Sequence, residues 1–363
     1  MRHPFLPVMS IALAAGAAAL IIEMTWMRWF RLLFGATAPA ASATLVAFFA
    51  GHALGAALCA RYLSRVDRPL RLAAVLSWTA AAWAIATPLL LLAGESLAAS
   101  VYHTLLAAPL RLTSFRFALA LAVTLPTALC FGALLPSLAA AAVRHPRTLG
   151  TTGNALYALN TLGALLGTAL AAFWLPAWLG VRAGYGVGVS LAVAAGLLAF
   201  HFSRPGVRSS QPAFPSSIPE GNRDVEHPDA WRHDTEPRGP GRLSPDLLGL
   251  ATLSGFVSLG AQVLFVQAFA LVLNQSVYAF GAVLVCVHAA LAVGALAVSS
   301  LHRAWPGAGR TAMGLALTLC ALALAGFPAL LHGMTDGFRY VGTEESGLGY
   351  PAVSILCVAV TAG

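Results

Sequence analysis

Long apolar runs alternate with short polar segments along almost the whole chain. We count ten such runs, at roughly 6–27, 38–60, 72–94, 116–143, 150–178, 181–202, 247–273, 277–301, 311–332 and 350–363. A helix needs about 20 apolar residues to cross a bilayer, and these runs lack the alternation of barrel strands. Only helices and closed barrels satisfy every backbone group in lipid. The pattern therefore predicts an all-α, polytopic membrane protein built as a helical bundle.

The composition agrees with a membrane location. Of the 363 residues, 59% are hydrophobic and only 9% are charged, whereas soluble proteins carry about 25% charged residues. The net charge is +8, and all 21 basic residues are arginines. These arginines lie between the apolar runs and do not alternate with aromatic residues on one face. We interpret them as signals of membrane orientation and expect no nucleic-acid partner.

The distribution of arginines predicts which side each connecting segment faces. With the N-terminus in the cytoplasm, 15 arginines fall in inside segments and 6 in outside segments. Positive charge is enriched in cytoplasmic loops of membrane proteins. We therefore expect the N-terminus to be cytoplasmic.

One segment interrupts the apolar pattern and divides the chain. Residues 203–246 are rich in Pro, Ser, Gly and mixed charge, so they cannot bury enough apolar area to offset the entropy of ordering. We predict a disordered cytoplasmic linker at 203–246. It separates a first membrane repeat at 1–202 from a second at 247–363.

The two membrane parts resemble each other when the sequence is shifted by 239 residues. Gly16 then aligns with Gly255, Phe30 with Phe269, and Gly55-Ala56 with Gly294-Ala295. Six helices per half would make the halves parallel repeats, as in major-facilitator transporters. The same shift places Gly363 over Thr124. We therefore expect a major-facilitator-like 6+6 plan whose second half is incomplete.

Several motifs follow one another in the first half. E-x-x-W-x-R (Glu23, Trp26 and Arg28) precedes GAT at 35–37 and FFAGHALG at 48–55, and PTALCFGALLP at 126–136 precedes LYALNTLGALLG at 156–167. In these motifs the chain resembles the membrane part of the fused major-facilitator-like/spermidine-synthase proteins of bacteria. The resemblance extends over nearly the whole chain.

The resemblance implies a location in the bacterial inner membrane and a link to polyamines, through either a solute or an enzyme partner. Full-length members of that family carry a cytoplasmic aminopropyltransferase-like domain. This sequence has no Gly-rich strand-to-helix turn followed by an acidic residue, and no soluble stretch long enough for such a domain. We expect no cofactor, no catalytic residues and no metal site in this chain.

Glu23 is the acidic residue that lies well inside an apolar run. An ionised carboxylate in hydrocarbon is costly, so such residues usually mark solute or ion pathways. Glu23 could bind a cation, a proton or an amine; it could equally be a structural carboxyl near a helix end. Arg28 lies about 140° away around the helix, and we expect it to reach the outer interface.

A second group of polar residues lies at 154–161. Asn154, Tyr157 and Thr161 share one helical face, with Asn160 beside it. They could line a solute cavity or hold neighbouring helices together by hydrogen bonds. Small-xxx-small pairs, by contrast, indicate close helix packing; these are Gly51 with Gly55 and Gly163 with Gly167.

Three functional hypotheses remain open at this point. The chain could be a membrane module that handles a small cationic, polyamine-like solute. It could be an anchor or partner subunit of a separately encoded aminopropyltransferase-like enzyme. It could also be a truncated, inactive paralogue.

Overall fold

The computed structural model describes residues 5–35, 38–106, 108–143, 149–203, 245–273, 277–305, 309–339, 354–355 and 357–359. All regular structure in these residues is helical. The main helices are α1 Phe5–Phe34, α2 Ala38–Tyr62, α3 Pro69–Leu106, α4 Pro109–Ala142, α5 Leu149–Ala169, α7 Gly180–Phe202, α8 Pro245–Val272, α9 Val277–Ala304 and α10 Gly309–Met334. A π-helix, Leu170–Trp174, and the short α6, Leu175–Trp178, continue α5. The all-α prediction is confirmed for the described part of the chain.

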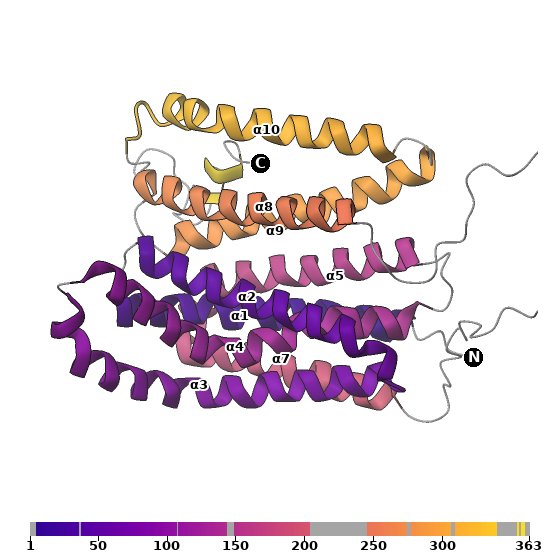
Figure 1. Ribbon diagram of the computed structural model, residues 1–363, viewed down its shortest axis with the longest axis horizontal. Coiled ribbons are helices and arrows are strands. Elements are labelled where there is room, and N and C mark those ends of the chain that lie inside the picture. Colours follow the sequence, from indigo (N-terminus) through magenta and orange to yellow (C-terminus); the bar gives the residue numbers. More distant parts are fainter. Residues whose placement is uncertain are drawn as a thin grey trace, which may run out of the picture.

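Nine stretches in the described residues are long and apolar enough to cross a membrane. They coincide with the first nine runs expected from the sequence. Most of the tenth run, at 350–363, and nearly all of the predicted linker at 203–246 lie outside the described residues. The chain is thus compatible with a multi-pass membrane protein, and the helices run roughly parallel to one another (Figure 1).

Proline and glycine fix where several helices begin and end. Pro69, Pro109 and Pro245 stand at the first position of α3, α4 and α8, where a helix does not need the missing N–H. Gly35 follows the end of α1, and Gly180 lies between α6 and α7. Their φ angles are 84° and 78°, values that residues with a Cβ rarely adopt. These turns let antiparallel neighbours follow each other closely.

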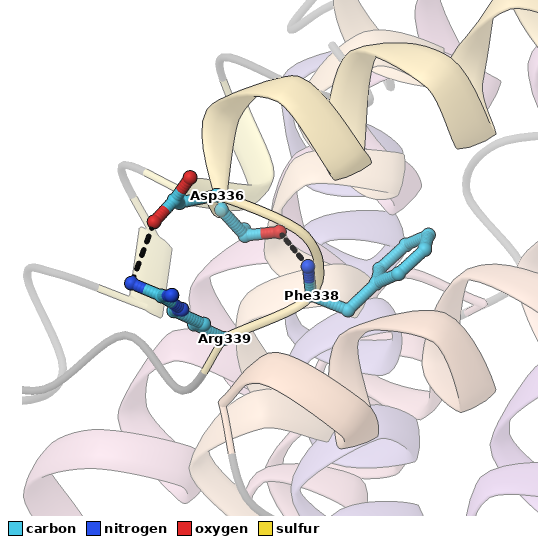
Figure 2. A network of polar contacts seen from close by, with 4 residues as sticks. Asp336, Phe338 and Arg339 are labelled. Atoms are coloured by element: carbon cyan, nitrogen blue, oxygen red, sulfur yellow. Dashed lines mark hydrogen bonds and ion pairs between the residues drawn. The ribbon is translucent and has the colours of Figure 1, made fainter.

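The end of α10 shows how a helix terminus satisfies its own backbone (Figure 2). The chain turns left-handed at 336–338, and Gly337 N–H donates to the carbonyl of His332 at 2.9 Å. The Thr335 hydroxyl accepts from the N–H of Phe338 at 3.1 Å. An ion pair of 2.7 Å joins Asp336 to Arg339. Because both side chains are largely exposed, this pair adds little stability.

Glycines allow two pairs of helices in the first half to touch backbone to backbone. A Cβ at Gly163 would overlap the carbonyl oxygen of Leu13, and one at Gly167 that of Ala17, so α5 crosses α1 at its closest approach here. In the same way Gly55 lies on the backbone of Leu129 and joins α2 to α4. Gly51 lies against the side chain of Ala128. The four glycines expected to pack helices are therefore all at close contacts.

Two apolar cores hold the helices together. The first lies within α1, α2, α3, α4, α5 and α7 and is built around fully buried side chains such as Trp26, Leu134 and Leu156. The second joins α1, α2 and the π-helix to α8, α9 and α10, through residues such as Met24, Phe269 and Phe280. In Figure 1, α5 lies between α1 and α9, which it contacts on either side.

The 239-residue shift recurs in the positions of the helices. Helices α1, α2 and α3 begin at residues 5, 38 and 69, and α8, α9 and α10 begin at 245, 277 and 309. The differences are 240, 239 and 240. Phe30 and Phe269, which the shift aligns, are 1% and 0% exposed. The first three helices of each part thus follow the spacing that the sequence predicts.

Candidate functional site

Glu23 lies in the interior of the helix bundle. Its side chain is 1% exposed, and neither carboxylate oxygen has a hydrogen-bond partner among the described residues. Some buried hydroxyls in the same bundle are satisfied locally; those of Thr25 and Thr168 donate to the carbonyl four residues earlier. The hydroxyl of Ser77 and the indole N–H of Trp26, like Glu23, have no partner among the described residues. An ionised carboxylate has only acceptors to offer, and backbone N–H groups inside a helix already bond to carbonyls of that helix. Glu23 is therefore a buried group that needs a donor from elsewhere.

Gln262 occupies the equivalent place in the second part of the chain. It is 7% exposed, and its side-chain nitrogen has no hydrogen-bond partner among the described residues. Glu23 lies between Ile21 and Met24, and Gln262 lies one helical turn before Val266. These three apolar residues belong to the core that joins the two parts. Both unsatisfied polar groups thus come from residues that border the same core.

Arg28 does not pair with Glu23 in this structure. Its Nη2 atom donates to the carbonyl oxygens of Ala172 at 3.1 Å and Ala171 at 3.3 Å, both in the π-helix. In the π-helix the N–H of Leu175 donates to the carbonyl of Leu170, five residues earlier. The same spacing would pair residue 176 with the carbonyl of Ala171, but residue 176 is a proline, whose nitrogen carries no hydrogen. An α-helical bond from residue 176 to Ala172 is impossible for the same reason. Pro176 can donate to neither carbonyl, and Arg28 supplies a donor to both.

The carbonyls bound by Arg28 lie where the two parts of the chain meet. A Cβ at Gly281 of α9 would overlap the Cβ of Ala172, so α9 approaches the π-helix closely at this point. The rings of Phe173 and Tyr278 stack with centroids 6.0 Å apart. Arg28 thus helps to hold the segment on which α9 packs.

We expect the cost of losing Arg28 to depend on Pro176. Arg28→Met should lower the free energy of unfolding by about 1–3 kcal/mol, because two buried carbonyls lose their donor. In a Pro176→Ala background the residue-176 N–H can bond to a carbonyl of the π-helix, so the same replacement should cost less. Unfolding in mixed micelles for the four variants measures this coupling. An equal cost in both backgrounds would contradict the assignment.

The polar residues at 154–161 are not equally buried. Thr161 is 4% exposed and Tyr157 38% exposed, while Asn154 and Asn160 are half-buried. The backbone carbonyl of Asn160 lies against Gly16 of α1. Within the described residues these four side chains thus do not form one enclosed surface, although they remain close to the α1–α5 crossing.

Two histidines inside the apolar helices form local hydrogen bonds. The Nδ1 atoms of His52 and His288 lie 3.2 Å and 2.7 Å from the carbonyls of Phe48 and Leu284 in their own helices. Where residues are described, no group of three or more His, Cys, Asp or Glu side chains could hold a metal ion.

Two arrangements were not expected from the sequence. One is the binding of Arg28 to the π-helix; a proline near the end of an apolar run was the available signal. The other is a cavity between α1, α3 and α7 that includes Glu95 and Arg182. Nothing in the sequence brings these three segments together.

Comparisons with protein-family models, with curated proteins and with solved structures gave no match for this chain.

Proposed function

We propose that this chain is the membrane module of a transporter for a small cationic solute, with Glu23 as the group that binds the positive charge. The observation that carries the proposal is the buried carboxyl of Glu23, which has no partner among the described residues. A carboxylate in that position gains most from a ligand that brings both charge and hydrogen-bond donors. A protonated amine supplies both.

The place of Gln262 supports a solute path between the two parts of the chain. In transporters built from repeats, substrates bind near the bilayer midplane at the interface between the repeats. The shift of 239 residues aligns Gln262 with Glu23, and neighbours of both residues belong to the core that joins the two parts. One carboxylate and one amide would bind an amine without placing two negative charges together.

The chemical class of the solute is inferred from the motifs at 23–167, which resemble those of the spermidine-synthase-like membrane proteins. If the resemblance to the spermidine-synthase-like membrane proteins holds, the solute is a polyamine-like amine and the membrane is the bacterial inner membrane. The full plan of two parallel six-helix halves belongs to the same proposal.

Flux into proteoliposomes tests the proposal directly. The purified chain should transport labelled amines of one to three charges, with saturation, and unlabelled amine should compete. Sugars or carboxylates of similar size should not compete. Failure to move or bind any amine, in protein shown to be folded and inserted, would exclude this function.

A second candidate function is that of a membrane partner subunit, and one contrast favours it. Gly16 packs against the backbone of α5, and Gly55 packs against the backbone of α4. The shift of 239 aligns these glycines with Gly255 and Gly294, where a Cβ would have no described atom within 4 Å. Helices with the small-residue pattern of α4 and α5 would fit these faces, as they do in the first part.

Two leucine substitutions test whether protein or lipid covers the face of α9 that contains Gly294. If another helix covers α9, Gly294→Leu should dissociate the complex extracted from the native membrane. Gly314→Leu is the matched control, because Gly314 also lies in open space and its repeat equivalent Val75 is exposed. Equal behaviour of the two variants would leave lipid as the neighbour and remove this candidate.

A further inference from the structure

A cavity of about 620 Å³ lies between α1, α3 and α7, apart from Glu23 and Gln262. This volume falls in the range of about 300–1,000 Å³ typical of ligand sites. Its lining residues come from the last turns of α1, the second half of α3 and the start of α7. They are Trp29, Leu32, Leu33, Pro88, Leu91, Leu92, Glu95, Arg182 and Tyr185.

The inner end of the cavity is fixed by a proline and a tyrosine. Pro88 lies inside α3 and cannot donate to the carbonyl of Ala84, four residues earlier. The hydroxyl of Tyr185 donates to that carbonyl at 2.8 Å. The ring of Tyr185 lies 4.7 Å from that of Trp29, centroid to centroid. Residues from α1, α3 and α7 are thereby held together, so the cavity is part of the folded state.

Most of the cavity wall is apolar and continues onto the lipid-facing surface. Leu32 and Leu92 line the cavity and are 84% and 61% exposed. Pro88, Leu91, Leu92 and Glu95 recur at a spacing of three and four residues, so they share one face of α3. A hydrocarbon chain could therefore enter from the side without leaving an apolar environment.

Two opposite charges stand at the rim. Glu95 directly follows the apolar run expected at 72–94, and Arg182 is the third residue of the span that begins at Gly180. Both side chains are exposed, and neither has an ion-pair or hydrogen-bond partner in the described ranges. Residues at the ends of membrane spans lie at the level of the lipid headgroups.

We propose that this cavity binds a phospholipid whose headgroup carries both a phosphate and a primary ammonium. The guanidinium of Arg182 fits a phosphate in a bidentate manner, and the carboxylate of Glu95 accepts hydrogen bonds from the ammonium. A trimethylated ammonium has no N–H to donate, so the site discriminates between the two headgroups. The acyl chain lies along Leu32, Leu91 and Leu92. This inference does not depend on the function proposed for Glu23.

Native mass spectrometry of the delipidated protein tests the proposal. Phosphatidylethanolamine, phosphatidylcholine and phosphatidylglycerol with identical acyl chains serve as probes. We expect the ethanolamine lipid to bind about threefold or more tightly than the choline lipid, as for one charged contact at an exposed site. Glu95→Gln should remove this preference. Arg182→Gln should weaken all three lipids. Arg65→Gln and Asp67→Asn, in the segment between α2 and α3, should change neither the affinity for the three lipids nor the preference among them.

The thermal unfolding midpoint provides a second test, which does not require Glu95→Gln or Arg182→Gln to fold. Leu91→Trp places a larger side chain in the cavity, so the ethanolamine lipid should no longer raise the thermal unfolding midpoint, while the protein stays folded. Equal binding of the three lipids by the wild type would overturn the proposal. So would unchanged selectivity in the folded Glu95→Gln protein, undiminished binding of all three lipids by the folded Arg182→Gln protein, or an undiminished lipid response in Leu91→Trp.

Discussion

Replacing Glu23 by glutamine should reduce uptake of the cationic solute by about 30-fold or more. Removing one partner of a buried charge pair costs about 2–5 kcal/mol, and 2 kcal/mol corresponds to about 30-fold in affinity. Glutamine has nearly the same shape and is already present at the equivalent position, Gln262, where it is buried. The variant should therefore fold and insert normally, and the loss should appear in the flux measured in proteoliposomes.

Two further variants make the Glu23 result specific. Glu23→Asp keeps the charge and should retain part of the uptake. Asp67→Asn removes one negative charge from an exposed position between α2 and α3 and should leave uptake unchanged. Undiminished flux in Glu23→Gln would show that the carboxyl does not bind the transported cation. A loss of helical signal in this variant would instead assign the carboxyl a structural role.

Gly163→Leu should prevent α1 and α5 from packing and lower the free energy of unfolding by about 3 kcal/mol or more. Overpacking a core costs about 1–3 kcal/mol when side chains can adjust. Here a Cβ would overlap the backbone carbonyl of Leu13, so a whole helix must move. Unfolding of the purified protein in detergent, followed by circular dichroism, measures the effect.

Gly153→Leu is the matched control, because it lies in the same helix and a Cβ there meets nothing within 4 Å. We expect it to be neutral or slightly stabilising, since leucine has the higher helix propensity. Equal destabilisation by both replacements would mean that the α1–α5 crossing is not close. It would also weaken the placement of Glu23, which depends on how α1 is packed.

The sequence predicts the helices well because lipid imposes a length and a polarity that a single chain reveals. The first nine apolar runs coincide with the candidate spans, and the shift of 239 recurs in where α1, α2, α3 and their counterparts begin. Gly51, Gly55, Gly163 and Gly167 lie at close helix contacts, since small residues at a spacing of four are a local signal.

The contacts between distant helices could not be predicted in this way. Arg28 binds two carbonyls of a π-helix in another part of the chain, beside Pro176, which cannot donate to them. The face shared by Tyr157 and Thr161 differs in burial along its length, which helical periodicity alone does not reveal. The cavity with Glu95 and Arg182 requires three helices to meet. Each depends on tertiary packing and has no counterpart in local spacing.

Labelling of single cysteines from the two sides of the membrane tests the central claim, that these helices cross a bilayer in alternating directions. With the five native cysteines replaced, a cysteine at Ser64 or Ser203 should react with a membrane-impermeant maleimide in inverted vesicles only. A cysteine at Leu110 or Trp178 should react in right-side-out vesicles only. Reaction of all four positions from the same side, or a purified protein that stays in solution without detergent, would contradict the account.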